Sequence, residues 1–181
     1  MTRPSGYLEI AAAVASDLRA LGLDPVLVGG MALVVLGSRR VTRDFDFLVR
    51  TPADRLSDTI DALYERGLEL ASRVDATGEV VTTIGNRNAA KARLRLDEPV
   101  TAYFFNPETL LRIDLLFDFP LPVDALAARA TRMKIAGHVF KIASEPDLLE
   151  LKRIANRARA SAADAQDIAF LESRLKTADR E

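Results

Sequence analysis

Two aspartates that alternate with phenylalanines, in the run Asp44-Phe45-Asp46-Phe47, constrain this chain more than any other feature. In a strand, alternate side chains lie on opposite faces, so the aspartates share one face and the phenylalanines share the other. The two carboxylates would lie about 7 Å apart and repel each other. A divalent cation would offset that repulsion, and oxygen ligands suit Mg²⁺ or Mn²⁺. The run therefore predicts a strand with one apolar face and one cation-binding face.

A glycine pair, Gly29-Gly30, lies upstream of the aspartates, between a predicted strand at residues 26–28 and a predicted short helix at residues 31–36. Backbone N–H groups at such a strand-to-helix turn can approach an anion at the start of the helix. A phosphate-binding turn followed by a metal-binding pair of carboxylates indicates nucleotide chemistry. The alternative is that the glycines form a tight turn and nothing more.

In this order, the motifs resemble those of the nucleotidyltransferase superfamily, which has the fold of DNA polymerase beta. That superfamily adds a third carboxylate on a later strand, for which Asp114 in Leu-Leu-Arg-Ile-Asp is the candidate here. Within it, the AbiEii-type and related small bacterial nucleotidyltransferases are the most similar. They share an Arg-x-Thr-x-Asp motif and a helical lysine followed by Asp-x-x-Asp, which here are Arg40-Val-Thr42-Arg-Asp44, Lys152 and Asp164-Ala-Gln-Asp167.

The resemblance implies a magnesium-dependent enzyme that transfers NMP from an NTP to an acceptor and releases pyrophosphate. Asp44 and Asp46 would bind the metal that holds the triphosphate, while Asp114 would bind a second metal and take the proton of the acceptor hydroxyl. The residues implied to bind the nucleotide are Gly29, Gly30, Arg40 and Lys152. The superfamily often has a serine or threonine after the glycines, whereas Met31 stands here, which removes one hydroxyl contact to phosphate.

The AbiEii-type resemblance further implies the toxin of a bacterial toxin–antitoxin or phage-defence pair. An RNA such as a tRNA would then be the acceptor, and an antitoxin protein would be a partner. Two alternatives stay open, because a fold alone does not fix function. One is an enzyme that modifies a small molecule of the aminoglycoside kind. The other is a nucleotide-binding or regulatory protein with little turnover.

Some of the site residues also have simpler interpretations. Asp114 could form an ion pair with Arg112 instead of binding metal, because an acid in so apolar a segment needs a partner. Lys152 could be exposed to solvent on its helix. The pair Asp164 and Asp167 is expected to orient arginines, such as Arg157 or Arg159, rather than to bind metal.

Length and composition favour one soluble domain, with a core at residues 26–142 and C-terminal helices at residues 145–176. The 181 residues are 49% hydrophobic and 28% charged, which is ordinary for a globular protein. A net charge of −1 gives no sign of nucleic-acid binding through bulk charge. The chain has no cysteine, which excludes disulfides and thiol catalysis. No uncharged run is long enough to span a bilayer, so we expect a cytoplasmic protein without a membrane partner.

The periodicity of the rest of the chain predicts an α/β fold, with a mixed β-sheet flanked by helices. An opening helix carries an apolar stripe from Tyr7 to Leu21, and a second helix runs from Thr51-Pro52 to Gly67. Further strands are predicted at residues 79–84, 91–96, 111–117 and 139–142, with a turn at Asp97-Glu98-Pro99. Two final helices are predicted at residues 145–158 and 162–175, the second opened by a capping box of Ser161 and Asp164.

Overall fold

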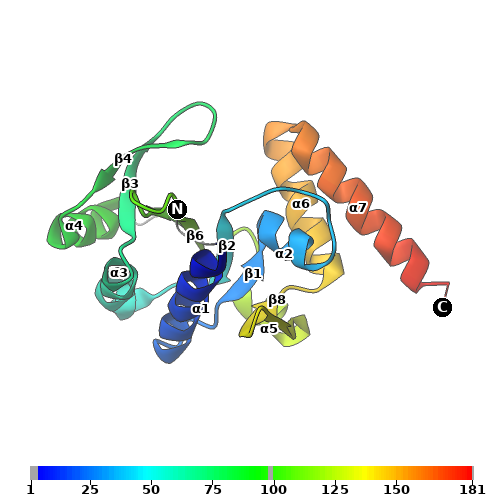
Figure 1. Ribbon diagram of the computed structural model, residues 1–181, viewed down its shortest axis with the longest axis horizontal. Coiled ribbons are helices and arrows are strands. Elements are labelled where there is room, and N and C mark those ends of the chain that lie inside the picture. Colours follow the sequence, from blue (N-terminus) through cyan, green and yellow to red (C-terminus); the bar gives the residue numbers. More distant parts are fainter. Residues whose placement is uncertain (1–3, 98–99, 181) are drawn as a thin grey trace.

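A mixed sheet of eight strands forms the centre of the protein, shown here as a computed structural model that describes residues 4–97 and 100–180 (Figure 1). In chain order the strands are β1 Val26–Val28, β2 Phe45–Val49, β3 Glu69–Val74, β4 Val80–Ile84, β5 Thr101–Phe105, β6 Arg112–Phe117, β7 Thr131–Ile135 and β8 His138–Ile142. Their order in the sheet is β4-β3-β5-β6-β2-β1-β8-β7. The β2–β6 and β1–β8 pairs are parallel and the others antiparallel, which confirms the predicted α/β class with a mixed sheet.

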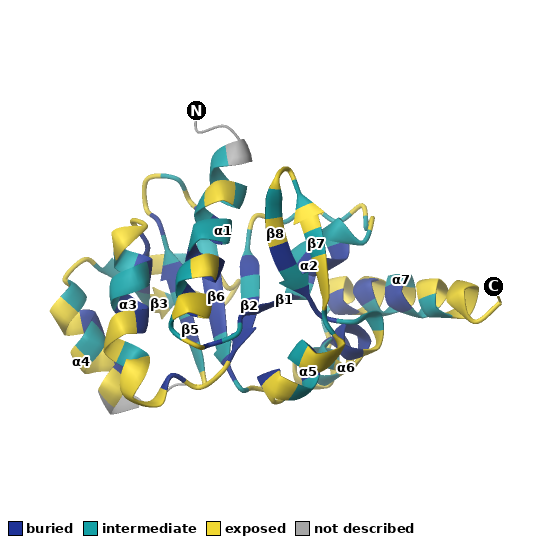
Figure 2. Ribbon diagram, turned by 90° about the horizontal axis from the view of Figure 1, so that it is seen from below, coloured by how far each residue is buried: buried dark blue, intermediate teal, exposed yellow. Residues whose placement is uncertain are grey.

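Helices α3 (Leu56–Glu65) and α4 (Arg87–Asp97) lie at one end of the molecule and α6 (Glu145–Arg159) and α7 (Ala162–Ala178) at the other, with α1 (Pro4–Ala20) between them (Figures 1 and 2). In chain order the helical segments are α1 Pro4–Ala20, α2 Gly29–Val35, the 3-10 turn η1 Ala53–Arg55, α3 Leu56–Glu65, α4 Arg87–Asp97, α5 Val123–Arg129, α6 Glu145–Arg159 and α7 Ala162–Ala178. Helix α3 contacts α1 and α4, whereas α6 packs on α7 and also contacts α2. The short helix α2 therefore joins the centre of the sheet to the C-terminal helices.

The phenylalanines of β2 lie in the core, as the alternation of the sequence predicted. Phe45 and Phe47 are each 1% exposed, and both rings stack on Phe140 of β8, with centroids 6.3 and 6.5 Å away. Figure 2 shows β2 and β6 as largely buried strands at the middle of the sheet. Because side chains alternate along a strand, burial of the phenylalanines turns Asp46 to the opposite face.

Side-chain caps begin the two C-terminal helices. The backbone N–H of Asp164 donates to Ser161 Oγ at 3.0 Å, which confirms the predicted cap of α7. Ser144 caps α6 in the same way, because the N–H of Asp147 donates to its hydroxyl. These contacts satisfy N–H groups that the first turn of a helix leaves without a partner.

The strand predicted at residues 91–96 is wrong, because this segment belongs to helix α4. Ala90 and Leu94 are both buried and lie four residues apart, which is the spacing of one helical face. The segment is also rich in alanine, lysine, arginine and leucine, which favour helix. The sequence analysis did not predict four elements: β3, β5, β7 and α5. The turn predicted at Asp97-Glu98-Pro99 lies partly outside the described residues.

No helix within the described ranges is both long and apolar enough to cross a membrane.

Candidate active site

Gly29 brings the start of α2 directly against Asp46. The antiparallel pairing of β1 with β2 sets Val28, the residue before the glycine, opposite Asp46. Gly29 has a φ of +67°, and a Cβ added to it would lie 2.0 Å from Asp46 Oδ2. Glycine is therefore required here both for the backbone conformation and for the approach of the carboxylate. The predicted helix start at Met31 is too late, since α2 already includes both glycines.

The third predicted carboxylate, Asp114, lies beside Asp46. The parallel pairing of β2 with β6 sets the two residues opposite each other. Arg112 Nε donates to Asp114 Oδ1 at 2.7 Å, and Arg112 Nη2 donates to Oδ2 at 2.9 Å. The ion pair considered in the sequence analysis is therefore present, and it engages both oxygens of Asp114.

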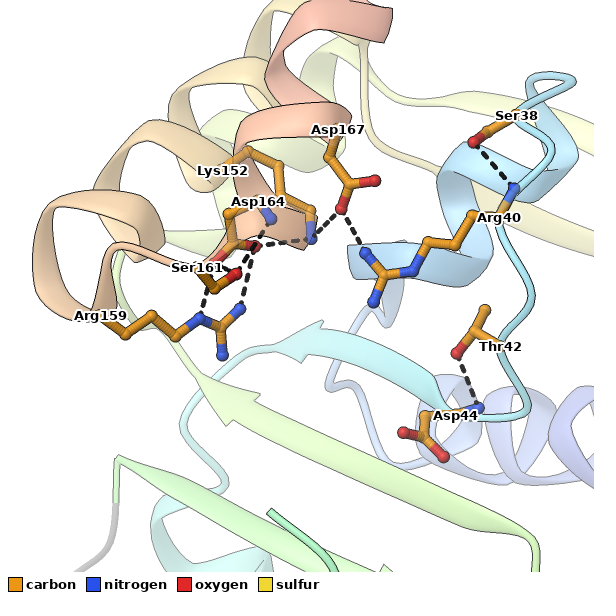
Figure 3. Close-up of polar contacts among 9 residues, drawn as sticks. All are labelled: Ser38, Arg40, Thr42, Asp44, Lys152, Arg159, Ser161, Asp164 and Asp167. Carbon is orange, nitrogen blue, oxygen red and sulfur yellow. Dashed lines mark hydrogen bonds and ion pairs between the residues drawn. The ribbon is translucent and has the colours of Figure 1, made fainter. Parts of the chain in front are cut away.

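Asp44 and Asp46 differ from the buried acids near them, because their carboxylates have no partner in the part of the chain that the structure describes. Asp44 precedes β2, and its backbone N–H donates to Thr42 Oγ1 at 3.3 Å (Figure 3). Within the described ranges, no hydrogen bond or ion pair reaches the carboxylate of either residue. The buried acids each have a cationic partner, namely Asp114, Asp147, Asp164 and Asp167. Two unpaired carboxylates, one on β2 and one just before it, leave room for a cation.

The electrostatics of this group also favour a bound cation. Burial raises the pKa of Asp46 above its ordinary value, and the charge of Asp44 raises it further, while Lys152, Arg112 and Arg40 lower it. Burial likewise raises the pKa of Asp114 to about 7, against the hydrogen bond from Arg112. A divalent cation would oppose both shifts, because it favours the ionised form of a nearby carboxylate.

A chain of alternating charges joins the segment before β2 to the C-terminal helices (Figure 3). Arg40 forms an ion pair with Asp167, which also binds Lys152 Nζ at 2.7 Å. Lys152 lies 3.3 Å from Asp164, whose carboxylate accepts two hydrogen bonds from Arg159 at 2.6 and 3.0 Å. The prediction that Asp164 orients Arg159 is confirmed.

The simpler interpretation of Lys152 is wrong, and of the two arginines considered for the Asp-x-x-Asp motif only Arg159 meets it among the described residues. Lys152 is not exposed to solvent, because the residue is 7% exposed and lies between two carboxylates. Arg157 does not meet the Asp-x-x-Asp motif and pairs instead with Glu150. Gly30 has a role of its own, since a Cβ there would lie 2.8 Å from Arg40 Nε. The second glycine therefore lets the guanidinium of Arg40 lie against the first turn of α2.

A cleft of about 350 Å³ contains most of these groups. Its polar lining includes Gly29, Asp46, Arg112, Asp114, Lys152 and Arg159, and its apolar wall includes Leu116, Phe119, Leu148 and Leu151. This volume lies in the range of small-molecule sites, which are typically mostly apolar with a few polar groups. Tyr103 also lines the cleft, and the sequence analysis missed it because β5 was not predicted. The aromatic run Tyr-Phe-Phe was the available signal for that strand.

The donor set fits one hard cation better than two. Asp44 and Asp46 offer free carboxylate oxygens, which suit Mg²⁺ or Mn²⁺. Among the residues that the structure describes, no three histidine, cysteine or acidic side chains are grouped so that they could hold a metal ion together. Asp114 is adjacent, but Arg112 already engages both of its oxygens.

Comparison with known proteins places this arrangement in a known fold. No family model and no curated protein matches the sequence. A nucleotidyltransferase-like protein from Paracoccidioides brasiliensis has a similar structure, with a TM-score of 0.58, 17% identity, and coverage of 92% of this chain and 75% of that one. The chain has a nucleotidyltransferase fold. The sheet and helices therefore have the architecture that the sequence resemblance implied.

Two further similar structures are antibiotic adenylyltransferases or resistance factors. The lincosamide antibiotic adenylyltransferase LnuA, with lincomycin bound, has a TM-score of 0.55 and 14% identity, and the match covers 91% of this chain and 96% of that one. The antibiotic-resistance factor ANT(2'')-Ia has a TM-score of 0.60 and 9% identity, with coverage of 96% and 86%. At such low identity the similarity concerns the fold, and the AbiEii-type resemblance stays a prediction.

Proposed function

We propose that this protein is a metal-dependent nucleotidyltransferase that transfers NMP from an NTP to an acceptor hydroxyl and releases pyrophosphate. The observation that carries the proposal is a pair of carboxylates, Asp44 and Asp46, that have no partner among the described residues and lie near the glycine turn of α2. Three cationic side chains lie close enough to lower the pKa of Asp46, namely Arg40, Arg112 and Lys152. A metal-bound triphosphate would complement both sets of charges.

Each of the predicted site residues then has a task. Asp44 and Asp46 would hold Mg²⁺ or Mn²⁺, which when bound neutralises the charge of the triphosphate. Gly29 and Gly30 expose the N–H groups at the start of α2 to a phosphate. Arg40 and Lys152 supply positive charge from positions that Asp167 holds fixed. Asp114 would take the proton of the acceptor hydroxyl, as the sequence resemblance implies.

For the acceptor we propose an RNA end, as the AbiEii-type resemblance implies, and hence a toxin role with an antitoxin partner. Two exposed arginines support this choice. Arg39 and Arg43 lie in the segment that leads to Asp44, and neither has a partner within the described residues. Free arginines beside the metal-binding strand suit a phosphate backbone, which supplies much of the affinity of proteins for nucleic acid.

A small-molecule acceptor is the second candidate. It is favoured by the similarity to LnuA, whose name says that it adenylylates lincosamide antibiotics and whose length this chain nearly covers. A cleft with an apolar wall would also accommodate such a molecule.

The test is transfer of label from α-labelled NTPs, with Mg²⁺, to total bacterial RNA and in parallel to a panel of lincosamides and aminoglycosides. We expect label on RNA, at a tRNA-sized species. Asp46→Asn and Asp114→Asn should each abolish it. Asp61→Asn is the matched control, because Asp61 pairs with Lys91 on α4, away from the cleft. Label on a drug but never on RNA would select the second candidate, and no transfer to any acceptor would contradict the proposal of an enzyme.

A further inference from the structure

Arg112 is held on three sides in the cleft. Its guanidinium forms a two-point contact with Asp114, lies 4.7 Å from the ring centre of Tyr103, and donates from Nη1 to the carbonyl of Gly78 at 2.5 Å. The side chains of Arg112 and Asp114 are 16% and 11% exposed. Such a fork between planar groups is among the strongest hydrogen-bonded ion pairs in proteins.

The three carboxylates that the sequence resemblance assigns to the site are therefore not equivalent. The carboxylates of Asp44 and Asp46 have no partner among the described residues, whereas both oxygens of Asp114 are engaged. A cation that binds Asp114 must take an oxygen from Arg112 and occupy the same space. It would also leave a largely buried guanidinium without its counter-charge, which is strongly unfavourable.

We propose that Arg112 competes with a second divalent cation for Asp114, so that the protein without nucleotide binds one divalent cation, at Asp44 and Asp46. The inference rests on the proposed function, because it takes the carboxylates to be a cation site. Arg112 supplies the positive charge that a second ion would otherwise bring to Asp114. The second site opens only when Arg112 leaves Asp114.

Release of Arg112 would involve more than one element. Gly78 belongs to the turn between β3 and β4, and Tyr103 lies on β5, so the guanidinium joins β6 to two neighbouring parts of the sheet. Tyr103 lines the same cleft as Asp46 and Lys152. A ligand that enters the cleft can therefore displace the guanidinium from its aromatic and carboxylate contacts together.

The experiment is a titration with Mn²⁺ in the absence of nucleotide, with free Mn²⁺ measured by electron paramagnetic resonance. We expect roughly one bound Mn²⁺ per chain for the wild type and roughly two for Arg112→Gln. The double variant Arg112→Gln/Asp114→Asn should return to roughly one, because its second carboxylate is removed. Arg129→Gln is the matched control, since Arg129 forms an equivalent two-point pair with Asp147 outside this cleft, and it should bind as the wild type does.

The variants also cover the case in which Arg112→Gln does not fold. Arg112→Lys keeps a charge but lacks the planar fork, so it should show the second site at a higher Mn²⁺ concentration than Arg112→Gln. Equal binding by the wild type and both Arg112 variants would overturn the competition.

The proposed function is tested separately in the same titration. If Asp44→Asn/Asp46→Asn binds as much Mn²⁺ as the wild type, the cation site of the proposed function is wrong. A second ion gained by Arg112→Gln would still support competition at Asp114. Conversely, loss of the ion in Asp44→Asn/Asp46→Asn with no gain in Arg112→Gln overturns only the inference about Arg112.

Discussion

Replacing Gly29 with alanine should harm both stability and cation binding, because two separate penalties meet at this residue. The φ of Gly29 is +67°, a conformation that costs an L-residue about 1–2 kcal/mol. The added Cβ would also lie 2.0 Å from Asp46 Oδ2 and 2.7 Å from its Cγ, so the carboxylate must move. Forcing an extra methyl group into a packed position costs about 1–3 kcal/mol. We therefore expect Gly29→Ala to lower the free energy of unfolding by about 2–5 kcal/mol.

Gly22→Ala separates the two penalties. Gly22 has a similar φ, +78°, but a Cβ there would meet nothing within 4 Å. This control should show only the backbone penalty of about 1–2 kcal/mol and should leave Mn²⁺ binding unchanged. Urea denaturation followed by circular dichroism measures both free energies, and the Mn²⁺ titration measures the site.

A double-mutant cycle with Asp46→Ala tests the contact itself. Asp46→Ala removes the two nearest atoms, at 2.0 and 2.7 Å, and keeps the Cβ of residue 46, at 3.0 Å. Gly29→Ala should then cost less in the Asp46→Ala background, with a coupling of about 0.5–3 kcal/mol. The reasoning is refuted if Gly29→Ala costs no more than Gly22→Ala and costs the same in both backgrounds.

Three further predictions concern the core, the carboxylates and the charge network. Phe47→Ala should lower the free energy of unfolding by about 3–5 kcal/mol, because it leaves a cavity in the core. Asp46→Asn should leave that free energy unchanged or raise it, because burial and the charge of Asp44 disfavour the ionised form of Asp46. Urea denaturation of both variants checks the order. The pKa of Asp114 is raised from 3.8 to about 7 without divalent cations, so between these pH values the folded state binds more protons than the unfolded state. The free energy of unfolding should therefore fall as pH rises through that range, and it should fall less steeply in Asp114→Asn. A wild-type profile that is flat or rises relative to that of the variant contradicts this. Asp167→Asn should raise the KM for NTP several-fold with a smaller change in kcat, because Arg40 and Lys152 lose the carboxylate that holds them. A change in kcat alone would assign Asp167 another role.

The strands and helix starts around the site could be predicted from the sequence, because each depends on a pattern of a few neighbouring residues. The apolar run before Gly29 marks β1, the alternation of Asp46 with its phenylalanine neighbours marks the faces of β2, and Ser161 marks the start of α7. These patterns depend on backbone geometry over a few residues. They give the class of the sheet but not all of its strands, since β3, β5 and β7 were not predicted.

The contacts between distant segments could not be predicted in the same way. The residues around Asp114 do not indicate that β6 pairs in parallel with β2. The partner of Arg40, Asp167, lies 127 residues further along the chain. The choice between metal and Arg112 as the partner of Asp114 needed the side-chain geometry. Helix α4 was mistaken for a strand because its charged residues alternate with small or apolar ones, and the buried spacing of Ala90 and Leu94 decides for helix.

The central claim is that unpaired Asp44 and Asp46 hold the metal of a nucleotidyl transfer, and paired labelling of the NTP tests it most directly. With Mg²⁺ and RNA, the wild type should move label from the α-phosphate but not from the γ-phosphate to the acceptor, with an equal amount of pyrophosphate released. Chelation of the metal, or the Asp44→Asn/Asp46→Asn variant, should remove both signals while Asp61→Asn retains them. Transfer of the γ-label, or unchanged α-transfer in the double variant, would contradict the account.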